Sequence, residues 1–350
     1  MIPTWVQQFA GGIGPPPTVP SAPTSLVVTG MEQTVRVAWS APVDTGGRPI
    51  LGYTIYYRAG TSGPFTSVPV PGTGIAFIDI GGLLASQLYQ VYVTAYNIVG
   101  EGSPTTTQSA TTIWDPSLLP GLVGWWDAEH LPSITKDGSD VVTSWACRKN
   151  PGNVLTQGAA GNRPTWSATG LGSRPAMVFN GSSSFLGITN VPSQIPTGSN
   201  AGDVFAVSQY NGVPTANVGS VMTDYGGGTS RRLMFRSLGG GGFSVVSGNA
   251  QPLGTYSATG NFINRCITYM STTAVNFTVG LIEQTGTETT TTSINSSVST
   301  GIVTFRVGSN SGGGSIYNGT MNTIIFTDTV LTGTDRTNLI TYLKYRGAIS

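Results

Sequence analysis

The sequence predicts an all-β chain of two sandwich domains in series, the second of which ends in a short helix. Apolar residues occur in short runs that alternate with polar residues, the pattern of strands with one buried face. The 49 glycines and 22 prolines are used between these runs, where they mark turns. With 350 residues, the chain is long enough for two domains that each bury a core.

Residues 21–113 form the first predicted domain. Alternating runs with turn signals between them are typical of an antiparallel sandwich. The candidate strands are residues 25–29, 35–39, 52–58, 65–70, 76–80, 88–97 and 105–112. We therefore expect a seven-stranded sandwich.

A family resemblance rests on particular residues of this segment. They are Pro23, Val37-Ala38-Trp39, Gly52-Tyr53-Thr54-Ile55-Tyr56-Tyr57, Tyr89-Gln90-Val91-Tyr92-Val93-Thr94-Ala95-Tyr96-Asn97 and Gly100-Glu101-Gly102. On them the segment resembles a fibronectin type III domain. The resemblance implies that Trp39 packs in the core and that Tyr89 forms a tyrosine corner, its hydroxyl bonding to backbone. It also implies a spacer or docking role, and the absence of Arg-Gly-Asp leaves integrin-type use without support.

Residues 1–20 are predicted to be an extended arm. Its apolar residues are Ile2, Trp5, Val6, Phe9 and Ile13, and it is broken by Gly11-Gly12 and Pro15-Pro16-Pro17. Because Trp5 and Phe9 would be unfavourable in water, we expect an anchor that docks into another subunit. A tail folded back on its own domain is the alternative. The arm has no Lys, no Arg and no long apolar run, so no secretory signal is predicted.

Residues 114–120 are predicted to be a short linker, and residues 121–350 a larger β-domain. Pro116 and Pro120 restrict motion at the linker. Candidate strands after it are residues 122–126, 141–145, 176–179, 203–209, 232–236, 243–246, 265–270, 276–281, 304–307 and 319–326. Ten or so strands over a segment of this length fit a double-sheet jelly roll.

One helix is predicted near the C-terminus. Thr332 and Asp335 have the spacing of a capping box, and Leu339 and Leu343 recur at i and i+4. Gly347 is expected to end the helix.

Three stretches of the second domain carry another resemblance. They are Gly121-Leu122-Val123-Gly124-Trp125-Trp126-Asp127-Ala128, Gly172-Ser173-Arg174-Pro175-Ala176-Met177-Val178-Phe179-Asn180-Gly181 and Asn318-Gly319-Thr320-Met321-Asn322-Thr323-Ile324-Ile325-Phe326. They resemble the concanavalin A-like lectin and glucanase superfamily in its laminin G-like, phage-associated form, which implies a jelly roll. Ser144-Trp145 also belongs to the resemblance, but the Ala146-Cys147-Arg148 that follows Trp145 departs from the aspartate and glycine usual at that place. Strand alternation predicts that one of Trp125 and Trp126 faces the core and the other a neighbour or solvent.

Composition limits the possible partners. Charged residues make up 9% of the chain and the net charge is +1, so neither nucleic acid nor an anionic membrane is expected as a partner. The surface must consist largely of Ser, Thr, Asn, Gln and Gly, as in extracellular β-proteins and virion proteins. No stretch approaches the roughly 18–20 apolar residues of a membrane span. Cys147 and Cys266 form either a disulfide or two buried free thiols.

Catalytic chemistry is poorly supported. The nearest approach to the alternating carboxylates of a β-glucanase is Asp127-Ala128-Glu129, interpreted as turn carboxylates. His130, the one histidine, has no nucleophile motif to serve and is expected to be structural or solvent-facing. No catalytic residue, zinc site or cofactor is predicted. The laminin G-like resemblance leaves calcium binding as an alternative, with loop carboxylates as ligands. The candidate ligands are Asp127, Asp137, Asp140 and Asp224.

A sugar site needs aromatic faces and planar polar groups. Tyr210 and Tyr225, with Arg231 and Arg232 in nearby Gly-rich loops, are the candidate carbohydrate-binding residues. The alternative is that these tyrosines cap the sandwich. Trp5 and Phe9 are the candidate anchoring residues.

The functional hypothesis is a non-enzymatic surface protein of a tailed-phage virion: a capsid decoration, fibre or tail-appendage subunit. Residues 1–20 would bind other virion proteins, the first domain would act as spacer, and the second would be displayed in many copies, with a host-surface glycan as possible ligand. A secreted, extracellular bacterial carbohydrate-binding module or adhesin is the alternative. A glycan hydrolase ranks third.

Overall fold

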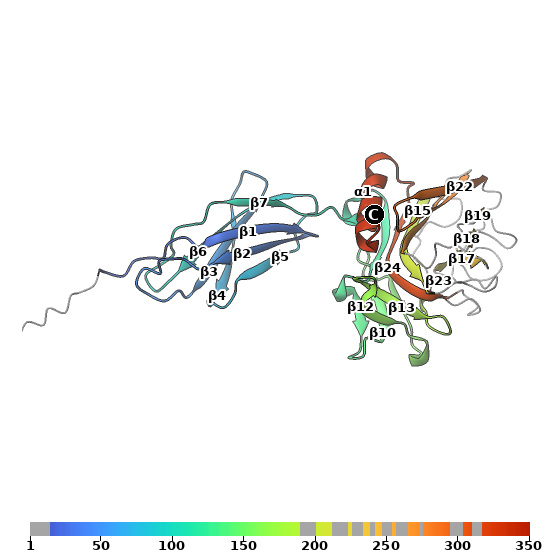
Figure 1. The fold of residues 1–350 in the computed structure, drawn as a ribbon, viewed down its shortest axis with the longest axis horizontal. Helices are drawn as coiled ribbons and strands as arrows, with labels where there is room; N and C mark the ends of the chain where they lie inside the picture. The colour runs from blue at the N-terminus through green and yellow to red at the C-terminus, as the bar shows by residue number, and fades with distance from the viewer. Residues whose placement is uncertain are drawn as a thin grey trace, which may run out of the picture. The chain divides into compact units, whose positions relative to one another are not determined.

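The computed structural model describes residues 15–189, 201–211, 223–225, 234–238, 242–246, 254–256, 265–272, 276–294, 304–309 and 317–350. The chain is all-β apart from one α-helix and short 3-10 turns in these residues. It divides into two compact units, Met1–Asp115 and Pro116–Ser350 (Figure 1).

The smaller unit is a sandwich of two antiparallel sheets. One sheet has the order β1-β2-β5, from β1 (Thr24–Met31), β2 (Thr34–Ser40) and β5 (Phe77–Gly81). The other has the order β4-β3-β6-β7, from β4 (Thr66–Pro71), β3 (Gly52–Ala59), β6 (Leu88–Tyr96) and β7 (Gln108–Thr111). All seven strands expected from alternation are present.

Two aromatic residues of this unit take the expected places. Trp39 is 5% exposed and packs edge-on against Tyr53, with ring centroids 5.2 Å apart. The hydroxyl of Tyr89 accepts a hydrogen bond from the backbone N–H of Leu84 at 3.1 Å. This bond ties the start of β6 to the loop before it, which is the geometry of a tyrosine corner.

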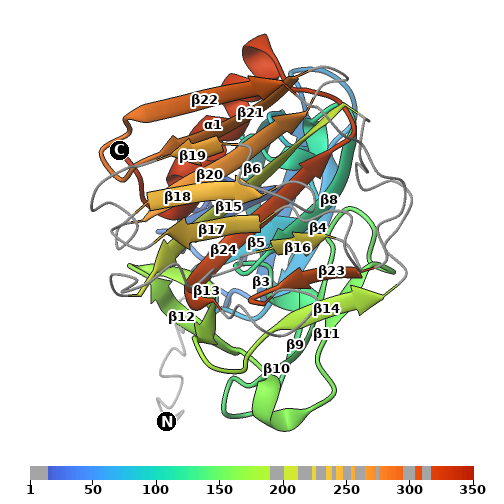
Figure 2. The ribbon, with the colours of Figure 1, turned by 90° about the vertical axis from the view of Figure 1, so that its right-hand side faces the viewer.

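The larger unit has two main sheets. The first, in the order β16-β23-β14-β11-β10-β9, contains β16 (Thr223–Tyr225), β23 (Thr304–Val307), β14 (Leu186–Thr189), β11 (Val154–Thr156), β10 (Val142–Ala146) and β9 (Ile134–Lys136). The second runs β12-β13-β24-β15-β20-β21-β22 (Figure 2), from β12 (Thr165–Leu171), β13 (Arg174–Asn180), β24 (Asn318–Thr327), β15 (Gly202–Tyr210), β20 (Cys266–Thr272), β21 (Asn276–Ile282) and β22 (Glu288–Ile294). β8 (Leu122–Asp127) pairs with β24.

Smaller elements complete this unit. A third sheet holds β17 (Met234–Leu238), β18 (Gly242–Val246) and β19 (Gly254–Tyr256). Short 3-10 turns occur at Pro116–Leu118, Leu131–Ser133 and Ala160–Asn162. The ten expected strands are all found, whereas short strands such as β9 and polar ones such as β22 were not foreseen. Pairing with a neighbour recruits β22, whose sequence Glu-Thr-Thr-Thr-Thr-Ser-Ile has no apolar alternation.

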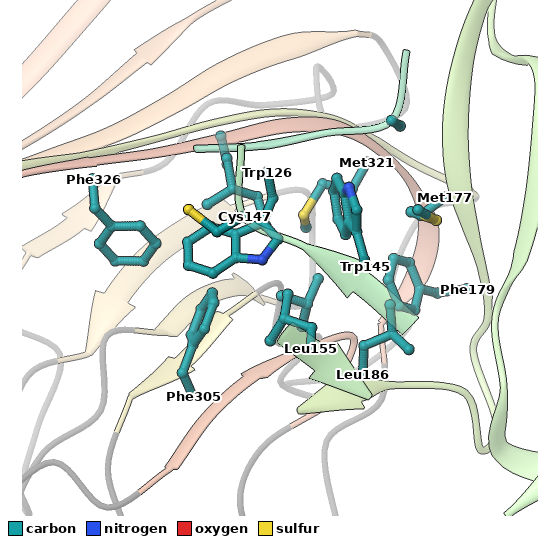
Figure 3. Packing of buried hydrophobic residues seen from close by; sticks show 14 of the residues in the cluster. Trp126, Trp145, Cys147, Leu155, Met177, Phe179, Leu186, Phe305, Met321 and Phe326 are labelled. Carbon is teal, nitrogen blue, oxygen red and sulfur yellow. The ribbon is translucent and has the colours of Figure 1, made fainter. Parts of the chain in front are cut away.

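An aromatic core fills the space between the two main sheets (Figure 3). The ring of Trp126 lies 5.2 Å from that of Phe305, and Phe305 meets Phe326 edge-on at 5.3 Å. Trp145 and Leu155 are fully buried in the same cluster. The strands of the two sheets are thereby joined by apolar burial.

Helix α1 (Gly333–Gly347) covers the other face of the large sheet, against β15, β20 and β24. Here the sequence-based expectation for the tryptophans was wrong in one respect. Trp126 faces the core as alternation requires, but Trp125 is only 2% exposed and meets Tyr342 of α1 at 6.2 Å. Trp125 therefore faces the protein's own helix, because the second face of the sheet is covered as well.

The ends of α1 also differ from expectation. Thr332 is the N-cap residue, yet its side chain makes no capping hydrogen bond. The backbone N–H of Leu331 instead binds the buried Asp203 carboxylate at 2.7 Å. Gly347 is the last helical residue, and Ala348 adopts the left-handed C-cap with φ 47°. A Cβ on Gly347 would lie 2.7 Å from Ile349 and 3.0 Å from Val207, so this glycine permits close packing.

Gly280 provides a test of packing on the helix-covered face. A Cβ there would lie 2.0 Å from Cζ of Tyr269, whose ring stacks on Phe205 at 5.3 Å and is 2% exposed. Because this ring has nowhere to move, we expect Gly280→Ala to lower the free energy of unfolding by about 1–3 kcal/mol.

Urea unfolding monitored by tryptophan fluorescence measures this effect. Gly138→Ala is the matched control, since a Cβ on Gly138 meets nothing within 4 Å. Equal stabilities of the two variants would contradict the packing argument.

Candidate functional site

The structure places one of the four predicted carbohydrate-binding residues. Tyr210 ends β15, is half-buried, and its ring lies 5.7 Å from that of Tyr317. The backbone of Tyr225 pairs with Phe305 in β16, but its side chain lies outside the described residues, as do Arg231 and Arg232. Trp5 and Phe9 also lie outside the described residues. Tyr210 packs against the core cluster of the larger unit.

Three asparagines lie on neighbouring segments at the end of β15 where Tyr210 is found, and of these the sequence pointed only to Asn211, the residue after Tyr210. Asn180 ends β13 and pairs with Asn318 at the start of β24. The N–H of Asn211 binds the carbonyl of Asn318 at 2.9 Å, and Nδ2 of Asn318 binds the carbonyl of Asn211 at 2.9 Å. Each of the three precedes a glycine, the one shared signal in the sequence. The Asn180 amide is engaged within its own loop, since its Oδ1 accepts the N–H groups of Ser182, Ser183 and Ser184. Amides offer both donors and acceptors, which in Asn211 and Asn318 suits a neutral polar ligand such as a sugar.

The Asp127 and Glu129 pair lies in a different environment from the turn that the sequence predicted. The Asp127 side chain is fully buried at the end of β8. Its Oδ2 accepts Nη1 of Arg148 at 2.7 Å and Nη2 of Arg346 at 2.9 Å. The turn itself exists, since the N–H of Glu129 binds Oδ1 of Asp127 at 2.9 Å. Asp127 is therefore the buried partner of two arginines.

Glu129 is held in the same network. Its Oε2 accepts Nη1 of Arg346 at 2.5 Å and Nη1 of Arg174 at 3.2 Å, and its Oε1 accepts Nδ2 of Asn322 at 3.1 Å. Arg346 thus donates to both carboxylates, from a helix 219 residues beyond Asp127. No local pattern could reveal this, because the arginines come from three separate elements.

A β-bulge brings Asn322 into the network. Val207 pairs with Thr323 and Ser208 with Met321, so Asn322 is an extra residue in β24. Its Nδ2 also donates to the carbonyl of Pro175 at 2.7 Å. A bulge re-aims the side chain of the extra residue, which here points Asn322 at Glu129.

Aromatic rings shield the arginines. The Arg148 guanidinium lies 3.6 Å from the ring centre of Trp125, and that of Arg174 lies 3.8 Å from the ring centre of Tyr345. Half-buried His130 lies beside the cluster. Its pKa is lowered by burial and by the positive charges of Arg148 and Arg346, against the opposing effect of Asp127, which favours a neutral imidazole at pH 7.

The contacts of this cluster are ion pairs within the chain. Both carboxylates direct oxygens at arginines. The cluster fastens the end of α1 to the first strand of the sandwich. We interpret it as a charged lock between β8 and α1.

Two further sequence questions concern metals and cysteines. The Asp137 carboxylate accepts the N–H groups of Ser139 and Val141, and Asp140 pairs with Lys136. Among the residues that the structure describes, no group of three or more His, Cys, Asp or Glu could hold a metal ion. Cys147 and Cys266 are free, buried thiols, and burial raises the pKa of Cys266 to about 12. The disulfide alternative is thereby excluded.

Comparison with known proteins identifies one of the two units. The family profile described as "Fibronectin type III domain" matches residues 21–112. Residues 21–112 are a fibronectin type III domain. A solved structure of the FN5 domain of Drosophila Lar is similar to part of this chain. The match covers 28% of this chain and 100% of the Lar domain, with 22% identity and a TM-score of 0.24.

Curated relatives match only part of this chain. Exoglucanase B of Cellulomonas fimi is 29% identical over 163 residues, or 44% of this chain and 14% of the relative. Ephrin type-B receptor 2 of Coturnix japonica is 29% identical over 150 residues, or 39% of this chain and 15% of the receptor. The chain thus spans about one-seventh of the length of these two relatives. In the described part of the chain, α1 is too short and too polar to cross a membrane.

The lock predicts a large difference between two arginine substitutions. Arg346→Gln leaves the fully buried Asp127 with one arginine fewer, and we expect it to lower the free energy of unfolding by about 3–5 kcal/mol. The matched control is Arg36→Gln, whose partner Asp79 is exposed, and it should change the stability far less, since solvent screens an exposed ion pair.

Chemical denaturation of both variants measures the difference. Thermal unfolding of the fibronectin type III domain should stay unchanged in Arg346→Gln, since Arg346 lies in the larger unit. An Arg346→Gln protein as stable as the wild type would refute the lock.

Proposed function

We propose that this chain is a non-enzymatic surface protein of a bacteriophage virion, serving as a capsid decoration, fibre or tail-appendage subunit. Residues 1–20 attach it to other virion proteins, the fibronectin type III domain is the spacer, and residues 121–350 are displayed outward in many copies. The larger domain is taken to be a concanavalin A-like, laminin G-like jelly roll on the resemblance of its sequence. Host-glycan adhesion is a secondary role of this displayed domain.

The proposal rests on a fibronectin type III domain that is followed in the chain by a larger β-unit. In that unit, the carboxylates of Asp127 and Glu129 are paired with arginines. Spacers and display domains need stable β-architecture and a neutral, polar surface, and 9% charged residues agree with that need. The two-sheet arrangement of the larger unit supports the jelly-roll assignment. The phage assignment rests on the resemblance of residues 121–350.

The alternative is a secreted bacterial carbohydrate-binding module or adhesin. Partial similarity to proteins named an exoglucanase and a receptor supports an extracellular or surface-binding module of this kind. Neither alternative requires nucleic acid, membrane insertion or a cofactor, and calcium remains an optional ligand. The locked positions of Asp127 and Glu129 argue against glycan hydrolysis in both cases.

Deletion of residues 1–14, which leaves Thr18 bonded to Asn97 within the domain, separates the two alternatives. A virion protein should lose attachment to particles, because the arm carries the anchoring side chains Trp5 and Phe9, whereas a free adhesin should keep its ligand. Particle co-sedimentation measures attachment, and electron microscopy of labelled particles shows whether it occurs at head or tail.

A substitution pair sharpens this test. Trp5→Ala with Phe9→Ala should reduce attachment as the deletion does, and Gln7→Ala with Gln8→Ala, in the same part of the arm, should leave it intact. Undiminished attachment of the deletion protein would rule out the anchor.

Glycan binding is tested separately on a glycan array with and without Ca²⁺. If Tyr210 and Asn318 contact a sugar, Tyr210→Ala and Asn318→Ala should each weaken binding about tenfold, the equivalent of roughly 1.4 kcal/mol. Leu131→Ala, which removes a side chain 48% exposed elsewhere on the larger unit, is the control. A blank array would remove the adhesion role and leave virion display standing.

A further inference from the structure

One end of the fibronectin type III domain exposes five large aliphatic side chains. Their exposed fractions are 90% for Val43, 75% for Ile98, 47% for Val99, 47% for Leu51 and 40% for Val19. We call these five residues the apolar tip. A patch of this kind on a domain surface indicates a contact with another segment or molecule.

Hydrogen bonds join the segments that carry the apolar tip. Nδ2 of Asn97 donates to the carbonyl of Thr18 at 2.8 Å and to that of Thr45 at 2.9 Å. Its Oδ1 accepts the N–H groups of Val99 at 2.8 Å and Gly100 at 3.2 Å. Asn97 is 4% exposed, so this amide is a buried connection between three segments.

Further backbone contacts hold the remaining residues at the same end. The N–H of Thr18 binds the carbonyl of Gly46 at 2.9 Å, and the N–H of Leu51 binds the carbonyl of Tyr96 at 2.9 Å. A Cβ on Gly100 would lie 3.4 Å from Cγ1 of Val19. The backbone that carries the apolar tip is therefore fixed by hydrogen bonds before any partner binds, which lowers the ordering cost of binding.

An apolar segment of the same chain, residues 1–14, directly precedes the residues at this end of the domain. Residues 1–14 lead into Thr18, which is bonded within the tip, and they contain Ile2, Trp5, Phe9 and no charged residue. Twelve residues separate Trp5 from Thr18, a reach of up to about 45 Å when extended. Gly11-Gly12 lies between them and permits a reversal of direction.

Tethering favours this segment over any other occupant. A segment joined to its site by a short linker has an effective concentration in the millimolar range, far above that of a free partner. The chemistry also matches, because both the segment and the tip are apolar and uncharged. We propose that residues 1–14 fold back and cover the apolar tip of their own fibronectin type III domain.

This inference adds a step to the proposed function without depending on it. Trp5 and Phe9 have two alternative surfaces: the tip in the free subunit and the partner after attachment. Covering Ile98 and Val43 before assembly keeps aliphatic surface out of water and opposes tip-to-tip association. Release of residues 1–14 from the tip then accompanies attachment.

Hydrogen–deuterium exchange of the full chain tests the contact. We expect the backbone amides of residues 97–100 to exchange about tenfold more slowly in the full chain than in a protein lacking residues 1–14. Ile98→Ser with Val99→Ser should expose the arm, seen as faster chymotryptic cleavage at Trp5 and Phe9. Leu84→Ser is the control, since Leu84 is 67% exposed beside the opposite end of β6.

Each outcome decides the proposal. Exchange that is unchanged by removal of residues 1–14 overturns it. The proposal is also overturned if the slow exchange disappears on dilution while light scattering shows the molar mass falling by half. In that case a second copy of the chain would cover the tip. Protection in a monomer that is lost in the deletion and unaffected by Leu84→Ser supports it. Particle attachment is measured independently, so failure here leaves the anchor test untouched.

Discussion

Burial of β24 on both faces is the constraint from which the larger unit follows. This strand pairs with β15 on one side and with β13 and β8 on the other, and it is buried along nearly its whole length. One face needs the aromatic core that contains Trp126 and Phe305, and the other needs α1. A second sheet and a C-terminal helix are both required, since an uncovered apolar face would be exposed to water.

The charged lock is a consequence of this arrangement. Once α1 covers the sheet, Arg346 at its last turn lies beside the end of β8, where Asp127 is buried. The bulge at Asn322 turns a further amide towards Glu129. Through Arg346, Asp127 and Glu129 join the C-terminal helix to the opening strand. The ion pairs of Asp127 and Glu129 with Arg346 therefore hold α1 against β8.

The smaller domain uses a polar residue in a comparable way. Asn97 connects the segment entering the domain with the loops after β2 and β6, as Arg346 connects α1 with β8. In both cases a buried polar side chain satisfies groups from distant segments, so that backbone or charge is not left unpaired. At the tip, this leaves the aliphatic side chains of Val43 and Ile98 turned outward, a surface suited to an apolar occupant.

The sequence by itself determined the all-β class, the strands with clear alternation, the C-terminal helix and the roles of Trp39 and Tyr89. These follow from local periodicity, and for the fibronectin type III domain from residues that recur at characteristic places. Only the tertiary structure decided which strands pair, that polar β22 joins the large sheet, and that Trp125 packs under α1. It also decided that Asp127 is buried against arginines from other elements and that Asn180, Asn211 and Asn318 meet. These features depend on contacts between residues far apart in sequence, and local periodicity contains no information about them.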